Sequence, residues 1–157
     1  MPNPEPAPLG QDDLHEILQA ALTRLFAEEM DILAADVSER TICAALAPML
    51  RPSFPHHRVH AEYNRRGIEP KQVRMPDADG NLTLNRVFPD LIVHQPGHDR
   101  ENLLIIEVKK TTNRDPDDAD LAKLDQMRQQ IGYRFAVFLR ISAGPNCTLQ
   151  DCRIRWV

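Results

Sequence analysis

Two apolar stretches of the sequence carry charged side chains that could do chemistry together. Asp90 lies within residues 86–94, and Glu107 and Lys109 lie within residues 102–109. A charge in the middle of a buried strand is costly unless it is paired or binds a metal. The connection between the stretches is short and contains Pro and Gly, which is typical of a hairpin, so we expect two antiparallel strands.

The spacing predicts that these charges meet on one face of the hairpin. If the turn is centred just after His98, partner residues have numbers that sum to 197, and Asp90 lies opposite Glu107. Directly opposed side chains have Cβ atoms about 4.5–5.5 Å apart. Lys109 is two residues from Glu107 and therefore shares its face. A register slip of one residue would separate the two acids.

These three side chains suit metal-assisted hydrolysis of a phosphodiester. The hard carboxylate oxygens of Asp90 and Glu107 favour Mg²⁺ or Mn²⁺, so one of these ions is the expected cofactor. The ion would polarise a phosphoryl oxygen and acidify a bound water. Lys109 would hold the attacking water or help to deprotonate it, and would offset negative charge as it develops. The alternative is a salt bridge between Glu107 and Lys109 that needs no metal.

The rest of the chain predicts the elements that would carry this hairpin. Apolar residues recur at spacings of three and four in three segments, which predicts helices. Alternating or continuous apolar residues predict four strands, and the last eleven residues could add a short one. The expected helices cover residues 12–34, 38–51 and 117–131, and the expected strands cover residues 58–64, 86–94, 102–109 and 133–141. Without the first helix the order is αβββαβ.

Local signals set several of the expected boundaries. Ser38 is the natural N-cap of the second helix, and Pro48 should end or kink that helix because its ring clashes with the preceding turn. Gly132 is placed to stop the third helix. Residues 65–81 are polar and contain an Asp-Gly-Asn turn signal, so we expect a loop there.

The residues that carry the chemistry resemble a known family. Residues 89–90, followed by residues 107–109, form the pattern Pro-Asp…(Asp/Glu)-x-Lys. This pattern resembles the PD-(D/E)xK phosphodiesterase superfamily, which includes the restriction endonucleases. The resemblance covers roughly residues 38–141 and implies a restriction-endonuclease-like αβββαβ core, with a mixed central sheet flanked by helices. The helix over residues 12–34 would be an N-terminal addition to that core.

The chain looks closer still to small, uncharacterised bacterial members of that superfamily. They have a helix that begins Glu-Arg, a strand that ends Glu-Tyr-Asn-Arg, and a hairpin that contains the acidic motif. The matching segments here are residues 39–40, 62–65, 89–94 and 102–110.

The resemblance adds residues to the expected site. The first core helix of the superfamily often supplies one more acid to the metal, and Glu39 matches that acid. The alternative for Glu39 is a glutamate that interacts with the helix dipole. Glu62, on the first strand, would complete the acidic cluster or face solvent. Lys123 and Gln126 lie on the helix after the hairpin, where side chains assist catalysis in some branches of the superfamily.

Basic side chains after the first strand and after the motif suggest contact with a nucleic acid. Lys and Arg supply most phosphate contacts, and the alternative is a solvated polar loop. DNA is the expected partner, and these residues also allow RNA. The residues expected at phosphates are Arg65, Arg66, Lys71, Arg74, Lys110 and Arg114.

Histidines raise the question of a zinc site. The spacing of five of them does not fit the paired-ligand patterns of zinc proteins. We expect His94, which shares strand parity with Asp90, to lie at the surface. The five histidines are His56, His57, His60, His94 and His98.

Composition and charge limit the possible functions. The chain has 157 residues, 42% of them hydrophobic, which fits one domain over residues 11–157 after a flexible Pro-rich tail over residues 1–10. No apolar run approaches the roughly 20 residues of a membrane span, and the tail does not resemble a signal peptide. Three cysteines are too few for a disulfide framework. We therefore expect a cytoplasmic protein with no membrane partner.

The net charge of −4 is unevenly distributed. Residues 1–50 contain nine acidic and two basic residues, a charge of −7, whereas residues 51–157 carry +3. The acidity therefore does not argue against a nucleic-acid partner for the second part.

Two functions are open at this point. We expect a metal-dependent nuclease that acts on DNA. The alternative is a catalytically inactive module of the same fold that binds nucleic acid or a protein partner. The apolar stripe of the helix over residues 12–34 motivates this alternative, because the stripe could pair with a second copy to form a homodimer. It could equally cover one face of its own domain.

Overall fold

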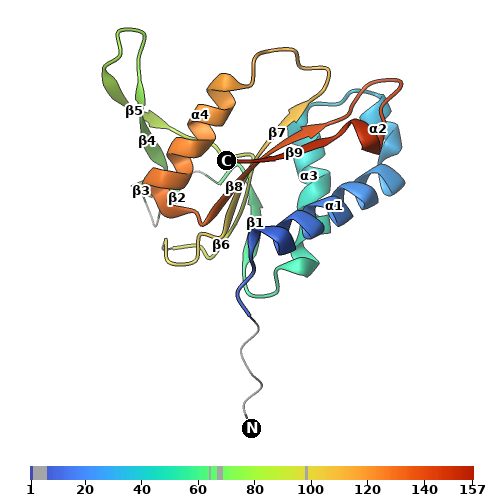
Figure 1. The fold of residues 1–157 in the computed structure, drawn as a ribbon, viewed down its shortest axis with the longest axis horizontal. Coiled ribbons are helices and arrows are strands. Elements are labelled where there is room, and N and C mark those ends of the chain that lie inside the picture. The colour runs from blue at the N-terminus through green and yellow to red at the C-terminus, as the bar shows by residue number, and fades with distance from the viewer. Residues whose placement is uncertain (2–6, 64, 67–68, 98) are drawn as a thin grey trace.

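A mixed sheet of five strands forms the centre of the structure (Figure 1). In spatial order the strands are β1 (Arg58–Ala61), β6 (Leu91–His94), β7 (Leu104–Lys110), β8 (Phe135–Ile141) and β9 (Arg153–Trp156). β7 and β8 run parallel, and the other neighbouring pairs run antiparallel. This computed structural model describes residues 1, 7–63, 65–66, 69–97 and 99–157, so Asn64, His98 and residues 2–6 of the tail lie outside the described residues.

Helices cover both faces of this sheet, as predicted. They are α1 (Gln11–Glu28), α2 (Met30–Ala34), α3 (Glu39–Leu50) and α4 (Asp118–Met127). Figure 1 shows α1 and α3 on one side of the sheet and α4 on the other. In β7, Leu104 and Ile106 belong to the buried cluster under α1 and α3, whereas Ile105 belongs to the cluster under α4. A strand that is buried on both faces reads as a continuous apolar run. None of the helices within the described residues is long and apolar enough to cross a membrane.

The predicted helix over residues 12–34 is interrupted. Glu29 has φ −126° and ψ 26°, which ends α1 before α2 begins. The apolar stripe of α1 is buried in the first cluster, where Leu14, Leu18 and Leu25 have almost no exposed surface. The stripe therefore covers a face of its own domain, and the structure does not support a homodimer formed through it.

α3 begins as predicted but does not end where Pro48 suggested. The Ser38 Oγ accepts a hydrogen bond of 3.2 Å from the Thr41 N–H, which caps the helix. Pro48 does not end the helix, because α3 continues to Leu50. A 3₁₀ turn, η1 (Arg51–Ser53), follows directly. The ring of Pro48 is on the exposed side of the helix, where the lost hydrogen bond is least costly.

The segment between β1 and β6 holds short strands rather than the predicted loop. β2 (Arg65–Arg66) pairs with β3 (Glu69–Pro70), and β4 (Gln72–Pro76) pairs with β5 (Leu82–Arg86). The predicted strand over residues 86–94 is therefore divided between the end of β5 and β6. The expected turn is present, because Asp77 Oδ1 accepts hydrogen bonds from the N–H groups of Asp79 and Asn81.

The predicted register of the central hairpin is confirmed. Leu91 pairs with Ile106, and Val93 pairs with Leu104, so partner numbers sum to 197. β1 is shorter than predicted, because Glu62 adopts a left-handed φ of 52° and breaks the alternation. The predicted helix over residues 117–131 is α4 followed by a π-helical turn, η2 (Arg128–Gly132), and Gly132 ends it with φ 90°.

Candidate active site

Asp90 and Glu107 come together where β6 begins. Asp90 precedes β6 and continues the hairpin register, so it faces Glu107 of β7. Its Oδ2 accepts a hydrogen bond of 2.8 Å from the Val108 N–H, and its carbonyl accepts one of 3.2 Å from the Glu62 N–H. These two bonds fix the backbone and the carboxylate of Asp90 at the same time.

Both carboxyl groups have unusual titration behaviour. Burial raises the pKa of Asp90, although the hydrogen bond from Val108 lowers it. Burial, and next the negative charge of Asp90, raise the pKa of Glu107. Two neighbouring carboxylates in a site with little water repel each other, so the pair releases its protons less readily than two exposed acids.

The carboxylate of Glu107 is only partly compensated. Its side chain is 7% exposed, and its Oε1 is buried and accepts no hydrogen bond from any described residue. The nearest cation is Lys123 of α4, whose Nζ lies 3.5 Å from that oxygen and whose side chain is about one third exposed. Lys123, an expected accessory residue, therefore faces the site and lowers the pKa of Glu107 in opposition to burial.

Lys109 is near the acids, but its ammonium group is occupied by other oxygens. Its Nζ donates to the carbonyls of Asp115 and Pro116, at 2.7 and 3.1 Å, and to Asp120 Oδ2 at 3.0 Å. Burial alone would lower the pKa of Lys109, but Asp120 and then Asp117 outweigh burial and raise it. Lys109 therefore stays charged, which suits it to stabilise negative charge and not to act as a base.

A cavity of about 550 Å³ opens beside this pair of acids. Its lining includes Glu39, whose Oε1 accepts a hydrogen bond of 3.1 Å from Asn113 Nδ2. The carboxylates that line it are those of Glu39, Asp90, Glu107, Asp115, Asp118 and Asp120, and Lys109 is the one cation among the described residues of the lining. So much negative charge would repel a phosphate unless a cation were bound there. Within the described residues, no group of three His, Cys, Asp or Glu side chains is arranged to hold a metal ion.

The other two expected accessory residues lie further out. Glu62 Oε1 accepts a hydrogen bond of 3.1 Å from Arg40 Nε. Glu62 lines a smaller cavity of about 360 Å³, which it shares with Glu39 and Asp90. Gln126 accepts a hydrogen bond from Gln130 and is absent from the lining of the main cavity.

The basic residues expected at phosphates have different environments. Lys71 is the clearest correction, because it is 2% exposed and donates to the Tyr133 hydroxyl at 2.6 Å. Arg66 forms an ion pair with Asp99, and Lys110 forms one with Asp36 at 3.0 Å. The residues that keep an exposed side chain in the expected segments are Arg65, Arg66, Arg74 and Arg114.

A buried polar cluster around His60 and His94 was not predicted from the sequence. His94 is buried, not at the surface as predicted, and its Nε2 lies 2.8 Å from His60 Nδ1. The ring of Tyr63 stacks on His60, and Lys71 lies over the ring of Tyr63. The pairing of His60 with Ile92 places His94 diagonally across the sheet, so a correct β1–β6 register would have shown this contact.

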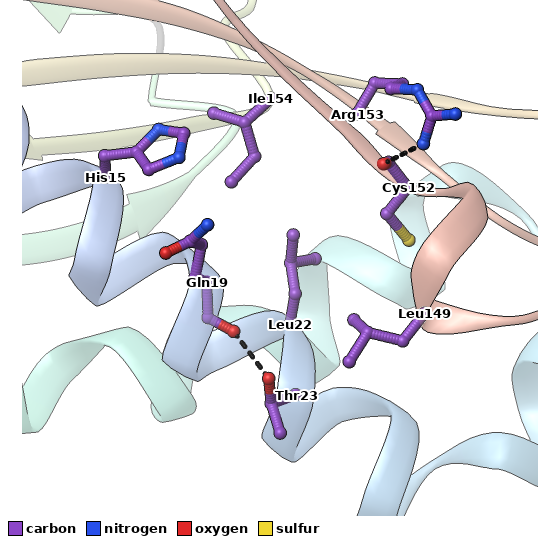
Figure 2. Close-up of a pocket in the computed structure, with 8 residues that line it drawn as sticks. All are labelled: His15, Gln19, Leu22, Thr23, Leu149, Cys152, Arg153 and Ile154. Atoms are coloured by element: carbon purple, nitrogen blue, oxygen red, sulfur yellow. Dashed lines mark hydrogen bonds between the residues drawn. The ribbon is translucent and has the colours of Figure 1, made fainter.

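A separate hollow of about 480 Å³ lies between α1 and the C-terminal segment. Figure 2 shows Leu22 and Ile154 pointing into it, with the Cys152 thiol at one side. The hydrogen bonds drawn there are from Thr23 to the Gln19 carbonyl, and from Arg153 to the Cys152 carbonyl. None of the described residues that line this hollow carries a carboxylate, so it is not a candidate for the predicted chemistry.

Comparison of the chain with protein-family models, with curated proteins and with solved structures gives no match. The geometry around Asp90 and Glu107 is therefore the basis for any functional assignment.

Proposed function

We propose that this chain is a divalent-metal-dependent phosphodiesterase that hydrolyses DNA, with a site of the PD-(D/E)xK type. One observation carries the proposal. Glu107 is buried opposite Asp90 beside a cavity, and its Oε1 has no hydrogen-bond donor among the described residues. Leaving a buried carboxylate only partly compensated is expensive unless the site exists to bind a cation.

The residues present fit Mg²⁺ or Mn²⁺. Asp90 and Glu107 supply hard carboxylate oxygens, which these ions prefer, and Glu39 lines the same cavity. When bound, the ion would polarise a phosphoryl oxygen and acidify a water. Lys109, which its oxygen partners keep charged, stabilises negative charge on the reacting phosphate. Lys123 offsets the charge of Glu107 in the absence of the ion.

The order of elements supports a restriction-endonuclease-like core as part of this proposal. α3, β1, β6, β7, α4 and β8 follow the order αβββαβ. The short strands β2 to β5 are an insertion between the first and second core strands, and α1, α2 and β9 are additions at the ends.

A catalytically inactive module of the same fold is the second candidate. The observation in its favour is the Lys109 ammonium, which already has three hydrogen-bond acceptors in the loop before α4 and in α4. In such a module Lys109 would hold this loop on β7 and would take no part in a reaction.

The two candidates are separated by one experiment on the full chain. Plasmid, linear duplex and single-stranded DNA are incubated with Mn²⁺ or Mg²⁺ and with EDTA, and Mn²⁺ binding is measured by calorimetry. We expect cleavage that needs the ion and falls at least about 100-fold in Asp90→Asn and Lys109→Met. Glu16→Gln, an exposed change on α1, should leave cleavage unchanged. Ion binding without cleavage supports the inactive module. The absence of both ion binding and cleavage contradicts the metal site itself.

A further inference from the structure

The β4–β5 hairpin stands apart from the central sheet. Its two strands pair only with each other among the described residues, with Arg74 opposite Leu84 and Gln72 opposite Arg86. Figure 1 shows the hairpin projecting beside α4, with its tip at the same end of the molecule as the start of α4. The cavity with Asp90 and Glu107 is lined by the first turn of α4, so hairpin and site are presented toward the same end.

One face of the hairpin is anchored to the domain. Val73 is fully buried in the cluster under α4, and Met75 packs against that cluster. The Gln130 side chain both accepts from the Arg74 N–H, at 2.7 Å, and donates to the Arg74 carbonyl, at 2.9 Å. These contacts hold β4 against η2, so the hairpin is supported along one side.

The opposite face is exposed and has an unusual composition. Side chains alternate along a strand, so Arg74, Leu82, Leu84 and Arg86 share this outer face. Leu82 is 70% exposed and Leu84 61% exposed, and Phe88, two residues after the end of β5, is 53% exposed. Such a cluster of exposed large apolar side chains marks a surface that binds something.

The charge on the outer face is positive. The guanidinium groups of Arg74 and Arg86 form no ion pair or hydrogen bond with any described residue. The two acids of the hairpin itself, Asp77 and Asp79, lie in the turn between the strands, where Asp77 accepts hydrogen bonds from backbone N–H groups. Two unpaired cations on a face without carboxylates are complementary to a phosphate backbone.

We propose that the β4–β5 hairpin grips duplex DNA, an inference that rests on the proposed function. A two-stranded ribbon fits a groove of the duplex. Arg74 and Arg86 contact phosphates on either side of the groove, while Leu82 and Leu84 press against the bases or sugars, as apolar wedges do in groove-binding proteins. The acidic cavity needs such a positive element nearby, because apart from a bound ion it offers mainly negative charge to the substrate.

The test measures binding of the full chain to a fluorescein-labelled 20-base-pair duplex by anisotropy, at several salt concentrations with Ca²⁺ present. In Arg74→Ala/Arg86→Ala we expect Kd to rise about tenfold or more, and the slope of log K against log salt to fall by about 1.8, since each phosphate contact contributes about 0.9. In Leu82→Ser/Leu84→Ser we expect weaker binding with an unchanged slope. Arg24→Ala/Arg51→Ala, which removes two exposed arginines elsewhere, should bind like the wild type.

Hydrolysis of bis(p-nitrophenyl) phosphate with Mn²⁺ separates this inference from the proposed function. This small diester reports on the site, and no residue of the hairpin is among the described residues that line the cavity, so both hairpin variants should hydrolyse it like the wild type. Wild-type binding of DNA in both hairpin variants overturns the inference and indicates a protein partner for the apolar face. Loss of DNA binding in these variants, when the wild type hydrolyses no diester, upholds the inference and overturns the proposed function.

Discussion

Replacing Glu107 by Gln should make the protein more stable in the absence of a divalent ion. The carboxylate of Glu107 is buried opposite Asp90, and Lys123, at 3.5 Å, is the one cation among the described residues that compensates it directly. Its pKa in the folded protein is raised above the ordinary 4.5, so the folded state binds a proton more readily than the unfolded chain. The contribution of Glu107 to the stability of the folded protein is therefore complete below pH 4.5 and is lost as the pH rises toward the raised pKa.

The size of the effect follows from that shift. Each pH unit over which the folded pair holds one more proton than the unfolded chain lowers the free energy of unfolding by about 1.4 kcal/mol. Between pH 4.5 and pH 8 this amounts to at most about 5 kcal/mol, and compensation by Lys123 reduces it. We therefore expect Glu107→Gln to gain about 1–3 kcal/mol at pH 8, which is about 2–10 °C in Tm for a chain of this length.

The assay is thermal unfolding at pH 5 and pH 8, with and without Mn²⁺. The gain of Glu107→Gln should be large at pH 8 and small at pH 5. Mn²⁺ should stabilise the wild type, by about 2.7 kcal/mol at 100 times its Kd, and should leave Glu107→Gln almost unchanged. The exposed control Glu16→Gln should behave as the wild type in all four conditions. A Glu107→Gln variant that is less stable than the wild type at pH 8 would refute the idea that the Glu107 carboxylate is only partly compensated.

Three further results are expected. Burial lowers the pKa of Lys71 to about 8, so the folded protein releases this proton above pH 8, whereas the unfolded chain keeps it until about pH 10.5, and the cost of the buried charge falls as the pH rises between these values. Urea unfolding should show that the wild type gains about 1–2 kcal/mol of stability relative to Lys71→Met between pH 7 and pH 9.5, and parallel pH profiles would contradict this. Lys109→Met should lose about 1–3 kcal/mol of stability because it leaves Asp120 without its cation, whereas Lys110→Met, at a more exposed ion pair, should lose less than about 1 kcal/mol. Leu18→Ala should cost about 2–5 kcal/mol, and light scattering should find a monomer in both Leu18→Ala and the wild type, since α1 packs within its own domain; a dimer that dissociates on this substitution would show that α1 pairs between chains.

Features set by short-range patterning could be predicted from the sequence. The connection between β6 and β7 is short, so its length fixed the pairing and placed Asp90 opposite Glu107. The Ser38 cap depends on one side chain and the next turn of backbone. The final strand β9 and the stop at Gly132 have the same local origin.

Features decided by distant contacts could not be predicted. The break at Glu29 occurs without a Pro or Gly at that position, and the axis of α2 runs in a different direction from that of α1 (Figure 1). The alternation of apolar and polar residues is weak in the β4–β5 hairpin, because large apolar side chains lie on its exposed outer face. In most strands these side chains lie on the buried face. The environment of Lys109 depends on how the loop before α4 folds back over β7, and the acid-rich sequence of residues 115–120 was the one available sign of it.

The closeness of Asp90 and Glu107 in the sequence affects the order in which the chain assembles. The two acids are seventeen positions apart and belong to one hairpin, whereas Glu39 comes from a helix fifty-one positions before Asp90. Hairpins close within microseconds, and more distant contacts form later. The two acids therefore repel each other from the start of folding, before α4 packs on the sheet and brings Lys123 close to Glu107. Acid conditions, which protonate one of the pair, should accelerate closure of the hairpin and with it the formation of the central sheet.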